Sequence, residues 1–188
     1  MRIFVYKIAI PLIAVFAIVS ILHILYYLMT LSITQSKQRL YCTMNLEQIA
    51  KGLEMYRLDV GKQKHYPQKN GQGFLIALYK ENLNPANVFL CPCTTDTNSK
   101  EELEDAPDEG DAEGPVSYAG RNNANPNVYP GLFATKLPRE RDPLAADDFG
   151  APHNHDYGNS INILFLDFHV EFQQQGHDNF PNLKVLGN

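Results

Sequence analysis

The sequence predicts an α+β protein in which one long N-terminal helix packs on a small antiparallel β-sheet. Three observations predict this fold class. An uncharged apolar run lies near the start of the chain, an amphipathic segment continues it, and short segments separated by Gly, Pro, Asn and Asp follow. The chain has 188 residues, which is enough for one modest domain and an appendage.

The apolar run extends from Ile8 to Ile33 and has no Asp, Glu, Lys or Arg among its 26 residues. A bilayer core about 30 Å thick needs roughly 20 helical residues, so this run is long enough to span it. A cleaved signal peptide is the alternative, but its apolar core is normally about 7–15 residues long and ends at a small-residue cleavage site. Neither feature is present. We therefore expect residues 1–33 to be an uncleaved, single-pass anchor in the lipid bilayer, although the flanking charges barely discriminate its orientation.

The amphipathic continuation covers residues 34–62. Its apolar residues follow the spacing of a single helix face: Leu46, Ile49, Ala50, Leu53 and Tyr56. No Pro or Gly interrupts the segment between Ile33 and Gly52, and Gly61 is a suitable stop. We expect one helix from about residue 6 to about residue 60, whose second half packs on a β-rich C-terminal domain, residues 63–188.

The charge of the chain is localised. The residues after Ile33 contain 14 basic and 21 acidic side chains, so their net charge is 14 − 21 = −7, and the tract Lys100–Gly114 alone contains eight acids and one lysine. No basic patch remains, which argues against nucleic acid as a partner. We expect residues 99–115 to be a solvated, disordered acidic loop, with a calcium-collecting loop as the alternative.

The closing segment "NILFLDFHVEF", Asn162–Phe172, predicts a β-hairpin. On one face of this segment, alternate residues are apolar before Asp167 and polar from Asp167 onward. A turn at Asp167–Phe168 explains this change, because the strand before the turn can be central in the sheet and the strand after it an edge. A two-residue type I′ turn needs positive φ at both positions. Phenylalanine pays about 1 kcal/mol or more for that conformation, so we expect a wider turn or a bulge.

The three cysteines, Cys42, Cys91 and Cys93, allow one disulfide and one thiol, or no disulfide. A bridge between Cys42 and Cys91 would tie the long helix to the sheet and close a loop of about 50 residues, which stabilises by roughly 3–4 kcal/mol. The alternative for Cys91 is a small buried apolar residue. A zinc site is disfavoured, because "CPC" has one intervening residue and His153 and His155 lack a matching second pair.

Calcium is the better metal candidate, because it prefers six to eight hard oxygen ligands, often from a loop. Carboxylates before and within the closing hairpin are the candidate ligands: Asp147, Asp148, Asp156 and Asp167. Solvated loop carboxylates are the alternative reading of the same residues.

Catalysis is not expected. Ser117 and Ser160 lack the Gly-x-Ser-x-Gly context of a nucleophile elbow. The chain contains no P-loop and no Gly-x-Gly-x-x-Gly. A set of Cys91 or Cys93, a histidine and Asp167 can be assembled on paper, but any chain of this size supplies one. We therefore expect a protein that is not an enzyme.

Several motifs together carry a resemblance. They are "CTMNLEQIAKGLEMYRLDVGKQKHYP", "VFLCPCTTD", "SYAGRN" and "NILFLDFHVEF", in that order over residues 42–172. They resemble the Cys-x-x-Asn-Leu…Tyr-Pro, Phe-x-Cys-Pro-x-Asp, Ser-Tyr-x-Gly-x-Asn and Asn-Val-Leu-Phe-x-Asp-Gly-His-Val-Glu-Phe segments of a group of type IV pilin and type II secretion pseudopilin-like proteins. This group is the bacterial, planctomycete-like prepilin-type family with a C-terminal His…Asp-Gly signature.

The resemblance implies a pilin-like fold in the bacterial inner membrane, with the C-terminal domain periplasmic or extracellular. It implies a structural or interaction subunit of a type II secretion or type IV pilus-like apparatus, which contacts itself or apparatus subunits through the N-terminal helix. It also raises the expectation of Ca²⁺, because major pseudopilins have a calcium site in their C-terminal β region. A membrane-tethered calcium- or ligand-binding domain is the alternative function.

Two departures from the family pattern separate this chain from typical members. Its first 33 residues contain no glycine and no acid, so the prepilin peptidase site and the assembly glutamate are both missing. In the closing signature, Phe168 replaces glycine, and eleven residues rather than nine separate His155 from Asp167.

Overall fold

The protein is described by a computed structural model over residues 2–61, 66–94, 96–106, 115–121, 142–147, 160–174 and 186–187, with side chains from residue 13 onward. The chain divides into two compact units, Met1–Lys37 and Gln38–Asn188. Within the described residues, the first unit is the beginning of one helix. The described part of the second unit contains the rest of that helix, two shorter helices, a 3₁₀ turn and five strands.

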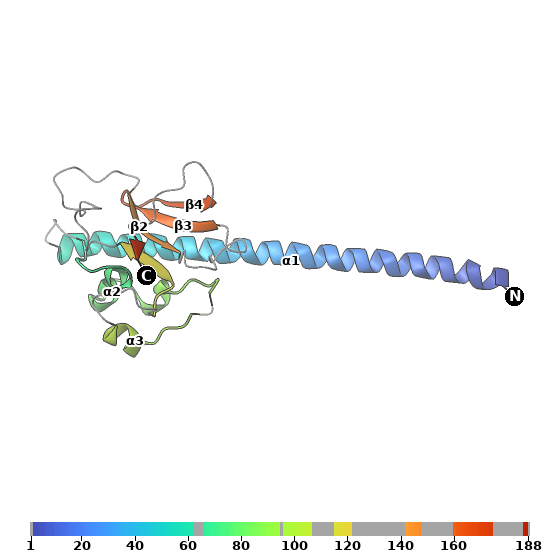
Figure 1. Cartoon of the computed structure of the whole chain (residues 1–188), viewed down its shortest axis with the longest axis horizontal. Helices are drawn as coiled ribbons and strands as arrows, with labels where there is room; N and C mark the ends of the chain where they lie inside the picture. The colour runs from blue at the N-terminus through green and yellow to red at the C-terminus, as the bar shows by residue number, and fades with distance from the viewer. Residues whose placement is uncertain are drawn as a thin grey trace. The chain divides into compact units, whose positions relative to one another are not determined.

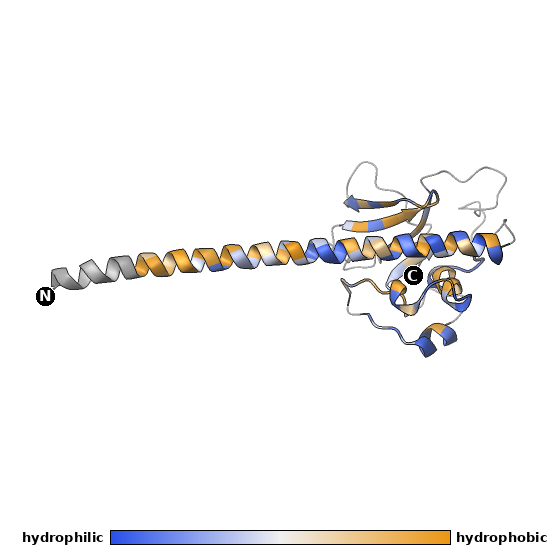
Figure 2. Ribbon diagram, turned by 180° about the vertical axis from the view of Figure 1, so that it is seen from behind, coloured by the Kyte–Doolittle hydropathy of each residue, from blue (hydrophilic) through white to orange (hydrophobic). Residues whose placement is uncertain are grey.

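Helix α1 spans Arg2–Asp59 (Figure 1), which confirms the single long helix predicted to end near residue 60. Its end is a tight turn in which the amides of Val60 and Gly61 both donate to the carbonyl of Tyr56, at 3.0 and 2.7 Å. Figure 2 shows the change of character along the helix: its described first half is almost uniformly apolar, whereas polar and apolar residues alternate in its second half.

The five strands form one antiparallel sheet in the order β4-β3-β2-β1-β5. Their bounds are Tyr118–Arg121 for β1, Pro143–Asp147 for β2, Ser160–Phe165 for β3, Val170–Gln174 for β4 and Leu186–Gly187 for β5. Pro143 is tolerated because it is the first residue of its strand, and the register shifts between Pro143 and Ala145. The α+β fold class predicted from the sequence is therefore confirmed.

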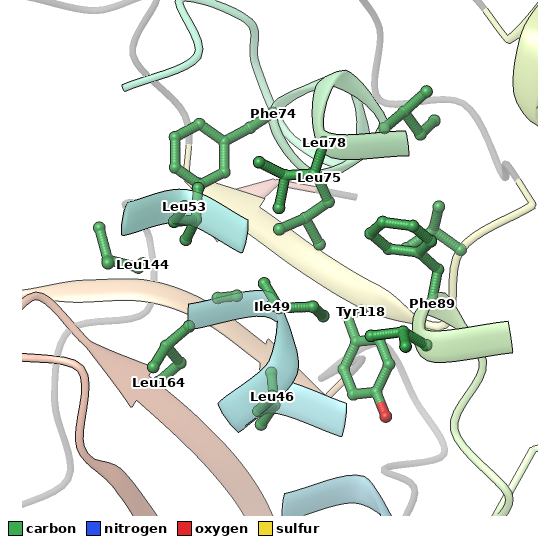
Figure 3. Close-up of a cluster of buried hydrophobic side chains, with 14 of the residues drawn as sticks. Leu46, Ile49, Leu53, Phe74, Leu75, Leu78, Phe89, Tyr118, Leu144 and Leu164 are labelled. Atoms are coloured by element: carbon green, nitrogen blue, oxygen red, sulfur yellow. The ribbon is translucent and has the colours of Figure 1, made fainter. Parts of the chain in front are cut away.

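The main core lies between the second half of α1, helix α2 (Gln72–Lys80) and one face of the sheet (Figure 3). From Cys42 to Leu53, every third or fourth residue of α1 lies in this core, and Leu46, Ile49 and Leu53 are fully buried. They meet side chains of α2 and of the sheet: Phe74, Leu75, Leu78, Tyr118, Leu144 and Leu164. At about 25 cal/mol per Å² of apolar surface, burying each such side chain stabilises by roughly 1.5–3 kcal/mol.

The β3–β4 hairpin confirms the wider turn that the sequence predicts. Leu164 pairs with Val170, the amide of Phe168 donates to the carbonyl of Phe165 at 2.9 Å, and the amide of Phe165 donates to the carbonyl of His169 at 3.0 Å. This is a three-residue hairpin loop, in which the last loop residue takes the left-handed conformation. Phe168 has a φ of 67°, and its ring offsets the strain by packing edge-on against Tyr66, with 6.5 Å between the ring centroids.

The acidic tract differs from the disordered loop expected over residues 99–115. Its first part is helix α3, Lys100–Asp105, and residues 107–114 lie outside the described residues. Ser99 and Glu102 form a reciprocal capping box, with hydrogen bonds of 3.1 and 2.6 Å to each other's backbone amides. Leu103 is fully buried and anchors this helix to the core. The many acids of the helix point away from the core, so a high charge density did not prevent folding.

Gly52 allows α1 to approach the segment that follows α2. A Cβ atom built at this glycine would lie 1.7 Å from Oδ1 of Asn84, and Nδ2 of Asn84 donates to the backbone carbonyl of Gln48 at 2.9 Å. The amide of Asn84 therefore fills the space that a side chain at position 52 would need. The close packing of Asn84 thus explains a glycine inside the helix, although glycine costs a helix about 1 kcal/mol relative to alanine.

We predict that Gly52→Ala destabilises the protein by about 1–3 kcal/mol, because the clash with Asn84 outweighs the gain in helix propensity. Thermal unfolding of the full chain in detergent measures the effect. Lys51→Ala, at an exposed neighbouring position, is the control and should change stability by less than about 0.5 kcal/mol. A Gly52→Ala protein that is more stable than the wild type would contradict the packing described here.

Candidate functional site

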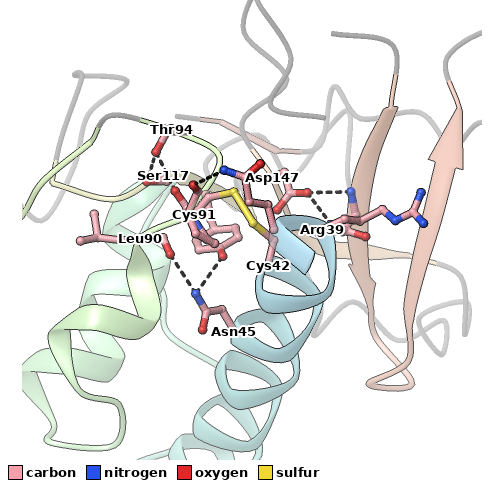
Figure 4. The surroundings of a disulfide bond; sticks show 12 residues. Arg39, Cys42, Asn45, Leu90, Cys91, Thr94, Ser117 and Asp147 are labelled. Carbon is pink, nitrogen blue, oxygen red and sulfur yellow. Dashed lines mark hydrogen bonds between the residues drawn. A yellow bond between two sulfur atoms is a disulfide. The ribbon is translucent and has the colours of Figure 1, made fainter. Parts of the chain in front are cut away.

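The candidate functional site is the group of sulfur and polar side chains around a disulfide between Cys42 and Cys91 (Figure 4). Cys42 lies on the core face of α1, and Cys91 follows the 3₁₀ turn η1, Ala86–Phe89. Their Cα atoms are 5.4 Å apart, within the usual range for disulfides. Both residues are buried, at 0 % and 2 % exposure. The bridge therefore joins the long helix covalently to the segment that leads to α3.

The third cysteine lies next to the bridge. The sulfur atoms of Cys42, Cys91 and Cys93 all lie within 4.8 Å of one another, and Cys93 is half-buried and is not part of the disulfide. Among the described residues, these cysteines are the one group of three or more His, Cys, Asp and Glu side chains whose ligand atoms converge in this way.

A tight turn explains how two cysteines separated by one residue converge. The carbonyl of Cys91 accepts hydrogen bonds from the amide of Thr94 at 3.0 Å and from its hydroxyl at 2.9 Å. Pro92 occupies the second position of this turn, where its fixed φ is favourable, and its carbonyl accepts a hydrogen bond from Nε2 of Gln38 at 3.2 Å. The sequence Cys-Pro-Cys-Thr thus folds back toward α1.

A polar network lies against the disulfide. Nδ2 of Asn45 donates to the carbonyl of Leu90 at 2.8 Å and to the hydroxyl of Tyr118 at 3.2 Å. The hydroxyls of Thr94 and Ser117 are 3.1 Å apart. These bonds connect α1, the Cys-Pro-Cys turn and strand β1, and they satisfy polar groups that would be costly to bury without partners.

Asp147 is the buried acid of this region. It is fully buried at the end of β2, and its Oδ2 accepts hydrogen bonds from the backbone amide and the side-chain Nδ2 of Asn162, at 2.9 and 2.8 Å. The hydroxyl of Thr43 donates to Oδ1 of Asn162 at 3.2 Å. Asp147 therefore stabilises the junction of β2, β3 and α1.

Tyr118 responds to this environment. Burial raises the pKa of its phenol well above the usual value near 10, the charge of Asp147 raises it further, and the hydrogen bond from Asn45 opposes both effects. The phenol is therefore a neutral structural group at physiological pH.

The structure describes two of the four predicted calcium ligands, Asp147 and Asp167. Asp147 is buried in a strand, whereas Asp167 lies exposed in the β3–β4 turn beside Nδ1 of His169. Asp147 contacts β3 at Asn162, so the strand separates it from the turn by roughly 10 Å or more, at 3.3 Å per residue. One calcium ion cannot be bound directly by both, since its ligand distances are about 2.3–2.6 Å. Asp148 and Asp156 lie outside the described residues, as do His153 and His155, so a calcium site built on that loop stays a prediction.

Two features of the site were not singled out from the sequence. The proximity of Cys93 to the bridge depends on the turn at Pro92, for which Cys-Pro-Cys-Thr is a local signal. The cap of α3 also has a local signal, the Ser-x-x-Glu pattern of a capping box.

Neither Ser117 nor Ser160 is accessible, because both are 1 % exposed.

No protein-family model, curated protein or solved structure matches this chain. The class is therefore given by the architecture: an α+β protein with a long N-terminal apolar helix whose second half packs on an antiparallel sheet. This arrangement is compatible with that of pilins.

We predict that stability falls as the pH rises above about 10. The native state keeps the phenol of Tyr118 protonated while the unfolded chain loses that proton, so the unfolded state binds fewer protons and the free energy of unfolding declines. The decline is up to about 1.4 kcal/mol per pH unit for one group. Tyr118→Phe should show a shallower decline, although it loses about 1 kcal/mol below pH 10 with the bond from Asn45.

Chemical unfolding of the full chain between pH 8 and about pH 12 measures this slope. A Cys93→Ser background prevents attack of an alkaline thiolate on the disulfide during the experiment. If the free energy of unfolding falls equally steeply with pH in the wild type and in Tyr118→Phe, the raised pKa of Tyr118 would be contradicted.

Proposed function

We propose that the protein is a single-pass, membrane-anchored structural or interaction subunit with a pilin-like domain, and that it acts in a type II secretion or type IV pilus-like apparatus. The observation that carries this proposal is the change in burial along α1. Large apolar side chains from Ile13 to Met29 are 51–70 % exposed, whereas Cys42, Leu46, Ile49 and Leu53 are completely buried.

An exposed apolar helix is stable in lipid and unfavourable in water. Among the described residues, α1 is the one helix long and apolar enough to cross a membrane, and none of its most apolar stretch is buried. A signal sequence has the same composition. An anchor is favoured because α1 continues without a break into the core of the second unit, so the helix has a structural role beyond targeting.

The site supports a structural role. Asp147, Asn162 and Asn45 are engaged in bonds that join elements of the fold. The disulfide favours an oxidising compartment, in keeping with a domain outside the cytoplasm of a bacterium and an anchor in its inner membrane.

The exposed side of α1 offers a contact surface for a second copy or another subunit. Residues of this surface recur at helical spacing: Leu40, Tyr41, Met44, Met55 and Leu58, each 44–58 % exposed. Apolar side chains at such spacing are typical of helix–helix contacts. The missing assembly glutamate means that packing of this surface would have to set the register.

We predict that the full-length chain stays in the membrane fraction after alkaline carbonate extraction and keeps its N-terminal residues, as mass spectrometry would show. Leu22→Arg with Leu25→Arg should release it, because each arginine at the centre of a span costs about 2.5–3.5 kcal/mol. Leu22→Val with Leu25→Val is the control and should leave the protein in the membrane. A soluble chain that has lost its first segment would overturn the proposal.

We predict that a photo-crosslinking residue at Gln48 captures a second copy or an apparatus subunit in native membranes. Met44→Lys with Met55→Lys should reduce the yield severalfold, since both lysines would have to be desolvated in the contact. Glu47→Gln with Glu54→Gln, on the same helix, is the control. A chain that yields no crosslink to any protein would argue against a subunit role.

A further inference from the structure

The disulfide and Cys93 form a three-sulfur cluster whose members differ in accessibility. Cys42 and Cys91 are buried, at 0 % and 2 % exposure, whereas Cys93 is half-buried. An external disulfide of any size therefore reaches Cys93 more readily than it reaches either bridged sulfur of the folded domain. All three sulfurs lie within 4.8 Å of one another, so a small movement of the Cys-Pro-Cys turn is enough to bring Cys93 into contact with either of the others.

We propose that Cys93 is the entry point for oxidation of this domain, and that it relays a disulfide from an external disulfide compound to the buried pair Cys42–Cys91. The ligand class is a small-molecule or protein disulfide. The inference concerns the second unit alone and does not depend on the partner of the anchored protein.

The relay has three balanced exchange steps, starting from the reduced, folded domain. The thiolate of Cys93 attacks the external disulfide, forms a mixed disulfide, and releases one external thiolate. The thiolate of Cys42 then attacks the sulfur of Cys93, forms a Cys42–Cys93 bridge, and releases the second external thiolate. Finally the thiolate of Cys91 attacks the sulfur of Cys42, and Cys93 leaves as a thiolate. Two electrons pass to the external disulfide, and each attacking thiol gives its proton to solvent.

The geometry favours Cys42–Cys91 as the resting state. The turn is held by bonds of Thr94 to the carbonyl of Cys91 and by the bond of Gln38 to the carbonyl of Pro92. The Cys42–Cys93 linkage would require this turn to move from its position in the structure and would strain these bonds. In the Cys42–Cys93 state the remaining thiol is that of Cys91, which is buried. The final exchange returns the turn to its resting position and leaves the remaining thiol on Cys93, which is more accessible.

The test uses the full chain in detergent micelles, reduced with dithiothreitol, freed of it under argon and reoxidised with oxidised glutathione. Peptide mapping at timed intervals should show a glutathione adduct on Cys93, then a transient Cys42–Cys93 bridge, and finally Cys42–Cys91. In Cys93→Ser the Cys42–Cys91 bridge should form at least about tenfold more slowly, because the attack must wait for local opening, and tenfold corresponds to about 1.4 kcal/mol. Near-ultraviolet circular dichroism of the reduced proteins checks that both are folded.

A second variant keeps the test decisive if Cys93→Ser does not fold. Cys91→Ala should trap the intermediate as a stable Cys42–Cys93 bridge, whereas Cys42→Ala with Cys91→Ala, which leaves neither partner thiol, should accumulate the glutathione adduct on Cys93. Equal rates of Cys42–Cys91 formation in wild type and Cys93→Ser, or failure of Cys91→Ala to form the Cys42–Cys93 bridge, would overturn the proposal.

Discussion

The packing of one face of α1 into the domain is the interaction on which the rest of the structure depends. Leu46, Ile49 and Leu53 lie in one cluster with side chains of α2 and of the sheet, so removing this face would take away a large part of the core that these layers share. Without this layer, apolar side chains of the sheet such as Leu144 and Leu164 would lose part of their cover and face water, which is unfavourable. The two parts of this helix therefore differ in character: the first is apolar on all sides, and the second buries one apolar face in the core.

Polar contacts between α1 and the sheet determine how the helix lies on it. The contact between α1 and the sheet is not uniformly apolar, because Thr43 and Asn45 of the helix meet Asn162 and Tyr118 of the strands. Each of these bonds has a required direction, whereas apolar contacts tolerate sliding. The polar pairs and the cation–π contact of Arg39 with Phe172, 4.4 Å from the ring centroid, therefore define the position of the helix on the sheet.

Local sequence patterns predicted part of the fold. The long helix follows from its apolar spacing, and a turn wider than two residues, or a bulge, follows from the poor fit of Phe168 to a two-residue turn. Asp147 could not be placed in the same way, because its burial depends on Asn162, which is distant in sequence and carries no local mark of a partner. Cys93 posed the same difficulty: the sequence allowed several pairings, and only the three-dimensional turn brings the third sulfur to the bridge.

The position of the disulfide has a mechanical consequence. The second unit begins at Gln38, and the covalent crosslink lies only four residues later, at Cys42. A pull applied to an anchored N-terminal segment would therefore reach the crosslink before it could peel the helix from the sheet. The load would pass through the bridge into the segment around Cys91, and the rest of α1 would be shielded from it. A domain built in this way resists unzipping of α1 from its N-terminal end, because the bridge takes the load before the helix face beyond Cys42 does.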